Sequence, residues 1–210
     1  MMRRSSATAL GFLLVPTLLV SGEATAGTAE TAASTSITTT TVATAPARTT
    51  AGTACSTPAR RPFAPQKASV RRVGRSITVY AMGRGSGGVP LPPPLTSAGK
   101  AAFSWDKYGP APGSAYGNVR FTAHTYPDGS ALGNRLLKRL RVGYRIILRG
   151  ETSTLCYKVT RKKVTTPTRL GGYYNTTGRP KLAIVVCSGK RLGPGNWTNR
   201  TIWIAKPYST

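Results

Sequence analysis

Residues 182–205, LAIVVCSGKRLGPGNWTNRTIWIA, contain two apolar runs joined by a polar connection rich in Gly. Cys187 stands at the end of the first run, and Arg200 stands at the start of the second. Short apolar runs bounded by Gly and Pro are typical of β-strands. The stretch therefore predicts two strands that carry a thiol and a guanidinium at their ends, where functional groups often lie on a rigid scaffold.

Similar apolar runs occur upstream of this stretch, separated by clusters of Gly and Pro. A helical period is visible only over residues 132–140, and we expect a short helix at 134–140 with Leu136, Leu137 and Leu140 on one side. Six or more short strands with Gly-rich turns predict an all-β fold, a closed or nearly closed barrel. The expected strands are 76–82, 118–123, 144–149, 154–164, 182–187 and 201–205.

The N-terminus has the pattern of an export signal. Two arginines precede an uncharged apolar run over residues 7–20, and Ala24-Thr25-Ala26 offers small residues at cleavage spacing. We expect residues 1–26 to be a signal peptide or a short membrane anchor. A helix over 7–20 would be about 21 Å long, short of the roughly 30 Å hydrocarbon layer, which favours cleavage. An anchor that recruits residues 21–22 remains open.

The remaining chain divides into a spacer and one folded domain. Residues 27–61 are rich in Thr, Ala and Ser and contain almost no large apolar side chain. Because such a segment cannot offset the entropy lost on ordering, we expect a disordered spacer. Residues 62–210 are expected to form the folded domain, which is long enough for a core without disulfides. The expected location is extracytoplasmic, secreted or held at the membrane through the N-terminus.

The charge of the chain is strongly positive. Its formal net charge is +25, and residues 63–210 hold 25 Lys and Arg against only three acidic residues. Such a surface predicts an anionic partner. Specific nucleic-acid binding is not expected, because there is neither a paired CxxC motif nor an aromatic RNP-type strand. Anionic wall polymers and lipid headgroups would supply the same attraction outside the cell.

Three cysteines in an exported chain leave at least one thiol unpaired. Cys55 lies in the spacer. Cys156, in the apolar run TLCYKV, is interpreted as a buried strand thiol. A bridge between Cys156 and Cys187 would inactivate Cys187 as a nucleophile.

Cys187, His124 and Arg200 form a candidate catalytic set. A cysteine attacks as the thiolate, which a neighbouring imidazolium favours, and His124 is the only histidine of the chain. An arginine can hold the oxyanion of a tetrahedral intermediate with a fork of donors that does not lose its proton. No cofactor and no metal site are expected, since the domain has too few carboxylates for calcium.

Several motifs in the same order resemble the sortases, the cysteine transpeptidases of Gram-positive surfaces, and most closely the actinobacterial class F. The resemblance spans nearly all of residues 62–210, and Trp197 and Arg200 follow the cysteine strand at the family's spacing. The motifs are FTAHTYPDGSALGN (121–134), LRVGYRII (140–147) and AIVVCSG (183–189), with GGVPLPPP (87–94), FSWDKYGPAPGS (103–114) and YGNVRFTAH (116–124) upstream.

The resemblance implies a sortase-like closed eight-stranded β-barrel with one or two short helices. It implies Cys187 as nucleophile, His124 as general acid for the departing amine, and Arg200 as the group that holds the substrate carbonyl or oxyanion. The implied substrates are surface proteins that carry an LPxTG-like sorting signal, cleaved after Thr through a thioester. The implied acceptor is an amine of peptidoglycan or its lipid-linked precursor. The strands of Cys187 and Arg200, with a loop at 188–199, are the expected groove walls.

Two positions depart from the sortase pattern, and two alternatives remain. Val186 replaces a common Thr before the cysteine, and Tyr144 replaces a common acidic residue, although neither change removes a catalytic group. An L,D-transpeptidase-like enzyme is disfavoured, because its cysteine motif should read S-x-G-C-R. A non-catalytic cationic cell-wall-binding module agrees with the charge and the spacer, and it predicts that Cys187 is replaceable.

Overall fold

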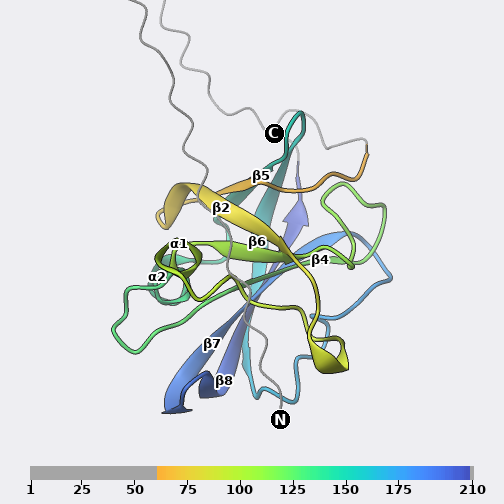
Figure 1. The fold of residues 1–210 in the computed structure, drawn as a ribbon. Helices are drawn as coiled ribbons and strands as arrows, with labels where there is room; N and C mark the ends of the chain where they lie inside the picture. The colour runs from red at the N-terminus through yellow and green to blue at the C-terminus, as the bar shows by residue number, and fades with distance from the viewer. Residues whose placement is uncertain (1–60, 209–210) are drawn as a thin grey trace, which may run out of the picture. The chain divides into compact units, whose positions relative to one another are not determined.

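The computed structural model describes residues 61–208, in which eight strands close into a barrel and two short α-helices lie between strands (Figure 1). The predicted all-β fold class is confirmed. None of the helices in residues 61–208 has the length and apolar character needed to span a bilayer. The elements are β1 (Lys67–Val70), β2 (Gly74–Met82), the 3-10 helix η1 (Ser86–Gly88), α1 (Ser97–Lys100), β3 (Phe103–Asp106), β4 (Asn118–Ala123), α2 (Leu132–Arg139), β5 (Arg145–Arg149), β6 (Thr154–Thr165), β7 (Lys181–Gly193) and β8 (Asn196–Pro207).

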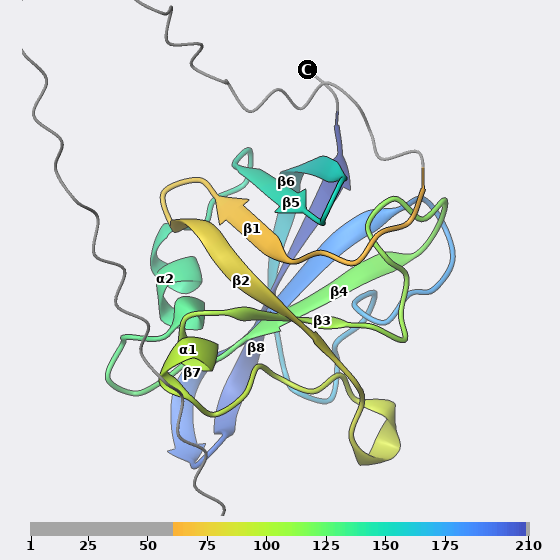
Figure 2. The same cartoon turned by 45° about the horizontal axis from the view of Figure 1, so that its top comes forward.

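The order of strands around the barrel is β1-β2-β3-β4-β7-β8-β6-β5. The pairs β2–β3 and β4–β7 are parallel, and the other neighbours are antiparallel. The parallel pair β4–β7 joins residues that are far apart in the chain, from Asn118 opposite Lys181 to Ala123 opposite Val186. The C-terminal strands therefore lie beside a strand from the middle of the domain (Figure 2).

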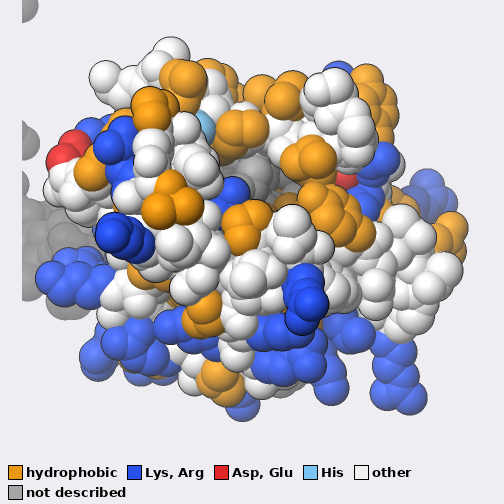
Figure 3. Space-filling view, turned by 90° about the horizontal axis from the view of Figure 1, so that it is seen from below, with side chains coloured by type: hydrophobic (Ala, Val, Ile, Leu, Met, Phe, Trp, Pro, Cys, Tyr) orange, Lys and Arg blue, Asp and Glu red, His pale blue; other side chains and the backbone are white. Residues whose placement is uncertain are grey.

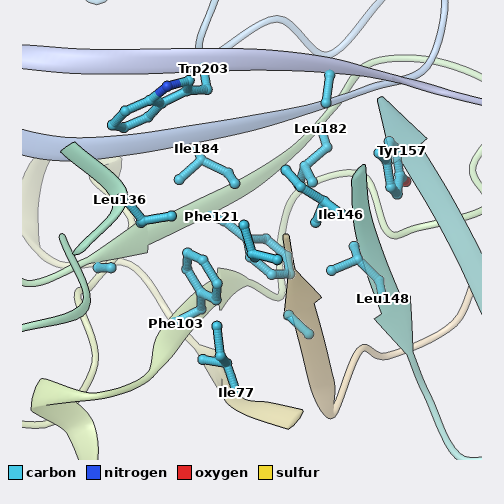
Figure 4. Packing of buried hydrophobic residues seen from close by; sticks show 14 of the residues in the cluster. Ile77, Phe103, Phe121, Leu136, Ile146, Leu148, Tyr157, Leu182, Ile184 and Trp203 are labelled. Carbon is cyan, nitrogen blue, oxygen red and sulfur yellow. The ribbon is translucent and has the colours of Figure 1, made fainter. Parts of the chain in front are cut away.

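The inside of the barrel is filled by the alternating apolar residues of the strands. Val119, Phe121 and Ala123 of β4 are buried in it, as are Ile184 and Val186 of β7. Figure 4 shows Phe103 and Phe121 beside each other, with ring centroids 5.4 Å apart. Each fully buried side chain of this size stabilises the fold by roughly 1.5–3 kcal/mol. The side chains at the intervening positions of these strands must then lie on the outer face of the barrel.

The predicted strands are confirmed, with β4 at its predicted bounds, and two strands were missed. β1 is only four residues long, and β3 has the sequence FSWD with all four residues buried. Each of these two strands has only four residues, and so short a run cannot be separated from a loop by its pattern. The helix α2 begins two residues before the expected start, and the four-residue helix α1 was not expected.

The predicted loop at 188–199 is wrong. Strands β7 and β8 continue past Cys187 and Arg200 as a long hairpin, with Ser188 opposite Asn199 and Arg191 opposite Trp197. Two register shifts interrupt the pairing, and Gly195 has a φ of +67° in the turn. Gly, Pro and Asn indicate turns in general. In this hairpin they lie at two irregularities of the strand pairing and in one tight turn, while the pairing of β7 with β8 continues on both sides.

Candidate active site

His124, Cys187 and Arg200 lie in one row across three neighbouring strands. Cys187 of β7 stands directly opposite Arg200 of β8. On the other side of β7, Ala123 is the last residue of β4 that pairs, with Val186, so His124 follows at the level of Cys187. Neighbouring strands are about 4.8 Å apart. The fold thus brings all three predicted residues together.

The row lies on the outer face of the barrel. Ala123 and Val186 are buried inside it, at 3% and 1% exposure. Because successive side chains of a strand point to opposite faces, Cys187 and its partner Arg200 point outward. Both are half-buried, as is His124, so the row is open to a ligand and still partly shielded from water.

Hydrogen bonds fix the segment of His124 against β7 and α2. Thr125 donates from Oγ1 to the carbonyl oxygen of Cys187 at 2.8 Å, which extends the contact with β7 beyond the paired residues. The backbone N–H of Gly133 donates to the carbonyl of His124 at 2.7 Å. A Cβ on Gly133 would lie 2.4 Å from that carbonyl and 2.5 Å from Thr125 Oγ1. Only glycine permits this close approach of α2.

The imidazole of His124 is held by the loop that follows β2. Its Nε2 lies 2.7 Å from the carbonyl oxygen of Pro93. A carbonyl only accepts hydrogen bonds, so Nε2 carries a proton and donates it. The other ring nitrogen, Nδ1, is then the atom of His124 that can gain or release a proton. Pro93 belongs to the segment GGVPLPPP, but nothing in that sequence indicated a contact with His124.

The guanidinium of Arg200 is held by the backbone of its own strand. Nη1 donates to the carbonyl oxygens of Trp197 at 3.2 Å and of Asn199 at 3.0 Å. Within residues 61–208, neither Nε nor Nη2 of Arg200 donates a hydrogen bond to the protein. These donors are available to a bound carbonyl oxygen, in a group that the backbone has already oriented.

The electrostatic environment of Cys187 acts in two directions. Burial raises the pKa of the Cys187 thiol, and the positive charge of Arg200 opposes that rise. A thiol in this setting is protonated at neutral pH more than a free cysteine is.

Figure 3 shows Lys and Arg side chains gathered along one side of the molecule and few acidic ones, so the wider surface favours anions.

A buried charge cluster lies on the outer face further along the strands. Asp106 of β3, whose side chain is fully buried, accepts two hydrogen bonds from Arg84 Nε and one from its Nη2. Arg120 Nε approaches the same carboxylate at 3.0 Å, without the alignment of a hydrogen bond. Arg120 Nη1 donates to the carbonyl of Tyr174 at 3.3 Å. The cluster ties the loop that precedes β7 to the strands beside the row.

The outer face of β7 and β8 is covered by the same loop. Tyr173 and Leu170 pack on Ala183, Val185 and Ile202. Burial raises the pKa of the Tyr174 phenol, and the charges of Arg120 and Arg200 oppose that rise. The loop carrying Pro93 therefore contacts His124, and the loop carrying Tyr173 and Tyr174 covers the outer face of the strands that carry Cys187 and Arg200.

The two described cysteines differ in redox state. Cys187 is a free thiol, as a nucleophile must be. Cys156 is buried in the strand β6, as predicted, at 2% exposure, but it takes part in a disulfide bond and is not a thiol. Because Cys187 is free, a bridge between the two is excluded. Cys55 lies outside the described residues, as do the predicted signal and most of the predicted spacer.

The model of a protein family described as "Sortase domain" matches residues 69–208. The chain belongs to the sortase family. The family assignment made from the motifs is therefore confirmed. Sortases are cysteine transpeptidases that act at the cell surface. Membership of this family also argues against an L,D-transpeptidase.

Solved sortase structures share the barrel of this sortase. The complex of Streptococcus agalactiae sortase C1 and MTSET has a TM-score of 0.52 at 17% identity, over 70% of each chain. Streptococcus suis sortase C1 gives 0.52 at 14% identity, over 72% of this chain and 75% of that one. Listeria monocytogenes sortase A has a TM-score of 0.50 at 17% identity, over 71% of this chain and 89% of that one. At these identities the likeness is one of fold. A comparison with curated proteins finds no match, and the class F assignment stays a prediction.

The residues that surround the row in this sortase were missed by sequence reasoning. Thr125, Gly133 and Pro93 each act through a backbone contact with a residue that is distant in the chain or on another element. The close spacing of Gly133 to His124 inside one motif was the only available signal. Of the departures from the family pattern, Val186 points into the core, where an apolar side chain is suited.

Proposed function

We propose that this sortase cleaves an LPxTG-like sorting signal after Thr and transfers the new carboxyl group to an amine of the cell wall. The observation that carries the proposal is the row of His124, Cys187 and Arg200 across three hydrogen-bonded strands. A nucleophile, a proton carrier and a fixed cation within one row are what acyl transfer through cysteine requires.

In the first step, Cys187 Sγ attacks the carbonyl carbon of Thr as the thiolate. The electron pair of the carbonyl moves to its oxygen, which is stabilised by the free donors of Arg200. When the C–N bond to Gly breaks, the departing amine takes a proton from Nδ1 of His124, since Nε2 is engaged by Pro93. The products are a thioester on Cys187 and the released C-terminal piece.

In the second step, the acceptor amine attacks the thioester carbonyl. His124 Nδ1 takes the proton that the amine loses, Arg200 again holds the oxyanion, and the thiolate of Cys187 leaves. An amide bond replaces the thioester, and the protonation state of His124 returns to that of the start. The order of events is therefore ping-pong.

The partners in this proposal follow from the family. The donors are surface proteins with an LPxTG-like C-terminal signal, and the acceptor is an amine of peptidoglycan or its lipid-linked precursor. An extracytoplasmic location, with residues 1–26 cleaved or retained as an anchor, agrees with this role. Mass analysis of the mature protein tests the first alternative, in which Gly27 is the first residue.

The test is turnover of a fluorogenic peptide carrying Leu-Pro-x-Thr-Gly in the presence of an amine acceptor. Cys187→Ala and His124→Ala are expected to abolish turnover. Arg200→Lys is expected to lose most of it, because a point charge cannot reproduce the planar fork. Lys190→Ala, an exposed change three residues after Cys187, serves as the control and should retain activity. Unchanged turnover in either alanine variant would overturn the mechanism, and an absence of turnover in the parent would instead support the non-catalytic wall-binding module.

The thioester itself has a separate test. Mass spectrometry of the enzyme quenched in acid during turnover should find the peptide up to Thr attached to Cys187. A methanethiosulfonate reagent should block this adduct by labelling Cys187, while Cys156 is spared because it is disulfide-bonded. Labelling at Cys156 alone would overturn the assignment of the nucleophile.

A further inference from the structure

A basic cleft lies away from the catalytic row. It has a volume of about 1240 Å³ and is lined by the outer faces of β1 and β5 and by the turn between β1 and β2. Its charged lining consists of one lysine and five arginines with no acidic residue: Lys67, Arg71, Arg72, Arg75, Arg145 and Arg149. None of the row residues lines it.

The basic cleft and the catalytic row are on opposite sides of the barrel. In the closed ring, two strands separate the β4–β7 pair from the β1–β5 pair in either direction, β3 and β2 one way and β8 and β6 the other. Figure 2 shows β1 and β5 on the side away from the free end of the β7–β8 hairpin. A ligand in the basic cleft therefore leaves the row unobstructed.

Several basic side chains of the cleft are held in place. Arg149 Nη1 donates to Ser69 Oγ on the floor of the cleft at 2.9 Å. Arg71 lies over the ring of Tyr144, with its guanidinium carbon 5.3 Å from the ring centre. Such contacts lower the side-chain entropy that an arginine loses when it binds a ligand. The cleft is thus partly organised before binding.

The turn that forms one wall of the cleft contains backbone strain. Arg72 has a φ of +61° and Ser76 a φ of +54°, and these are the only residues other than glycine with positive φ among residues 61–208. A side chain in this region costs about 1–2 kcal/mol, which glycine at position 72 would avoid. Non-glycine strain of this kind gathers at binding and active sites. In this turn the strained residue Arg72 lines the cleft.

We propose that the basic cleft binds a strand of a polymer of phosphodiesters without bases, such as a polyol phosphate outside the cell. Arginine forks match phosphate oxygens in pairs, and five of the six cations are arginines. The cleft is concave, which suits a single strand and not a flat bilayer. Its lining includes no aromatic side chain, on which the bases of a nucleic acid would stack. Bound in this way, the enzyme is held on an anionic polymer with its catalytic row facing away.

The test measures binding of fluorescent poly(glycerol phosphate) to the full-length protein by anisotropy, at several salt concentrations. The triple variant Arg72→Ser, Arg75→Ser, Arg145→Ser is expected to bind about tenfold more weakly, with a shallower salt dependence. The control triple Lys107→Ser, Lys163→Ser, Lys190→Ser removes the same charge outside the cleft and should bind within about twofold of the parent. Equal losses in the two triples would overturn the proposal.

Two further arms distinguish the partner and the role of the strained turn. Phosphatidylglycerol vesicles and single-stranded DNA should show no greater loss in the cleft triple than in the control triple, and a selective loss there would overturn the polymer assignment. Arg72→Gly relieves strain, so it should fold at least as stably as the parent and still bind the polymer more weakly. Unchanged binding by Arg72→Gly would also count against the proposal. Turnover of a short soluble peptide should be unaffected, which separates this result from the proposed function.

Discussion

Thr125 donates a hydrogen bond from Oγ1 to the backbone carbonyl of Cys187 at 2.8 Å, and so joins the histidine segment to the cysteine strand. Thr125 is 8% exposed, so little water can replace this donor. Thr125→Val keeps the shape and removes the bond, at an expected cost of about 1–2 kcal/mol in the free energy of unfolding. We also expect a fall in kcat of about tenfold from misplacement of His124.

Thr125→Ser is the matched control, because it keeps the hydroxyl. Urea unfolding and turnover of the fluorogenic peptide measure the two effects. If Val and Ser at this position give the same kcat, the hydrogen bond does not position His124.

Gly133→Ala should damage the site from the side of α2. The new Cβ would lie 2.4 Å from the carbonyl oxygen of His124, so the helix or the histidine must move. Overpacking of this kind costs about 1–3 kcal/mol of stability, and we expect lower turnover as well. Gly171→Ala is the control, because a Cβ there meets nothing within 4 Å. Equal turnover in the two variants would contradict the prediction.

Asp106→Asn should destabilise the fold by about 3 kcal/mol, because it leaves Arg120 buried without a counter-charge. The exposed ion pair between Lys100 and Asp128 offers a comparison within the same chain, and Asp128→Asn should change the unfolding midpoint in urea very little. The measurement is the difference between the urea unfolding midpoints of the Asp106→Asn and Asp128→Asn variants. Similar midpoints would show that the cluster around Asp106 contributes no more than a surface pair.

The reactivity of Cys187 should depend on pH through Arg200. Burial raises the pKa of the thiol and Arg200 opposes the rise, so alkylation by iodoacetamide should increase with pH up to above the ordinary cysteine range of about 8.5. Arg200→Gln removes the opposing charge and should move the midpoint of the rate profile to higher pH. A midpoint that stays or falls would show that Arg200 does not act on the thiolate. Circular dichroism across the same pH range controls for unfolding.

The fold was predictable where a strand is long enough to form a distinct apolar run. β4 and β6 could be located because their apolar residues lie between Gly- and Pro-rich segments. The strand β3 could not, because its 4 residues are too few for their pattern to differ from that of a loop. The extension of β7 and β8 beyond the barrel could not either, since its stability comes from pairing between strands and not from an apolar pattern.

The candidate site was predictable in its three reactive groups and not in what holds them. Cys187, His124 and Arg200 were assigned by residue type and by the spacing of motifs, and their catalytic roles stay predictions. The contacts of Pro93 and Thr125 each join a side chain to a backbone carbonyl, and which carbonyl lies within reach depends on the path of segments distant in the chain. The disulfide of Cys156 was not foreseen for a related reason, because spacing in sequence does not give pairing.

The parallel pairing of β4 with β7 has a consequence for the order in which the protein matures. His124 lies in the middle of the domain, while Cys187 and Arg200 lie on its last two strands. During synthesis the N-terminal part of a chain emerges first, and pairings between distant residues form slowly. The nascent chain therefore has no reactive row until β8 has joined the sheet, and a product truncated before residue 200 would be inert.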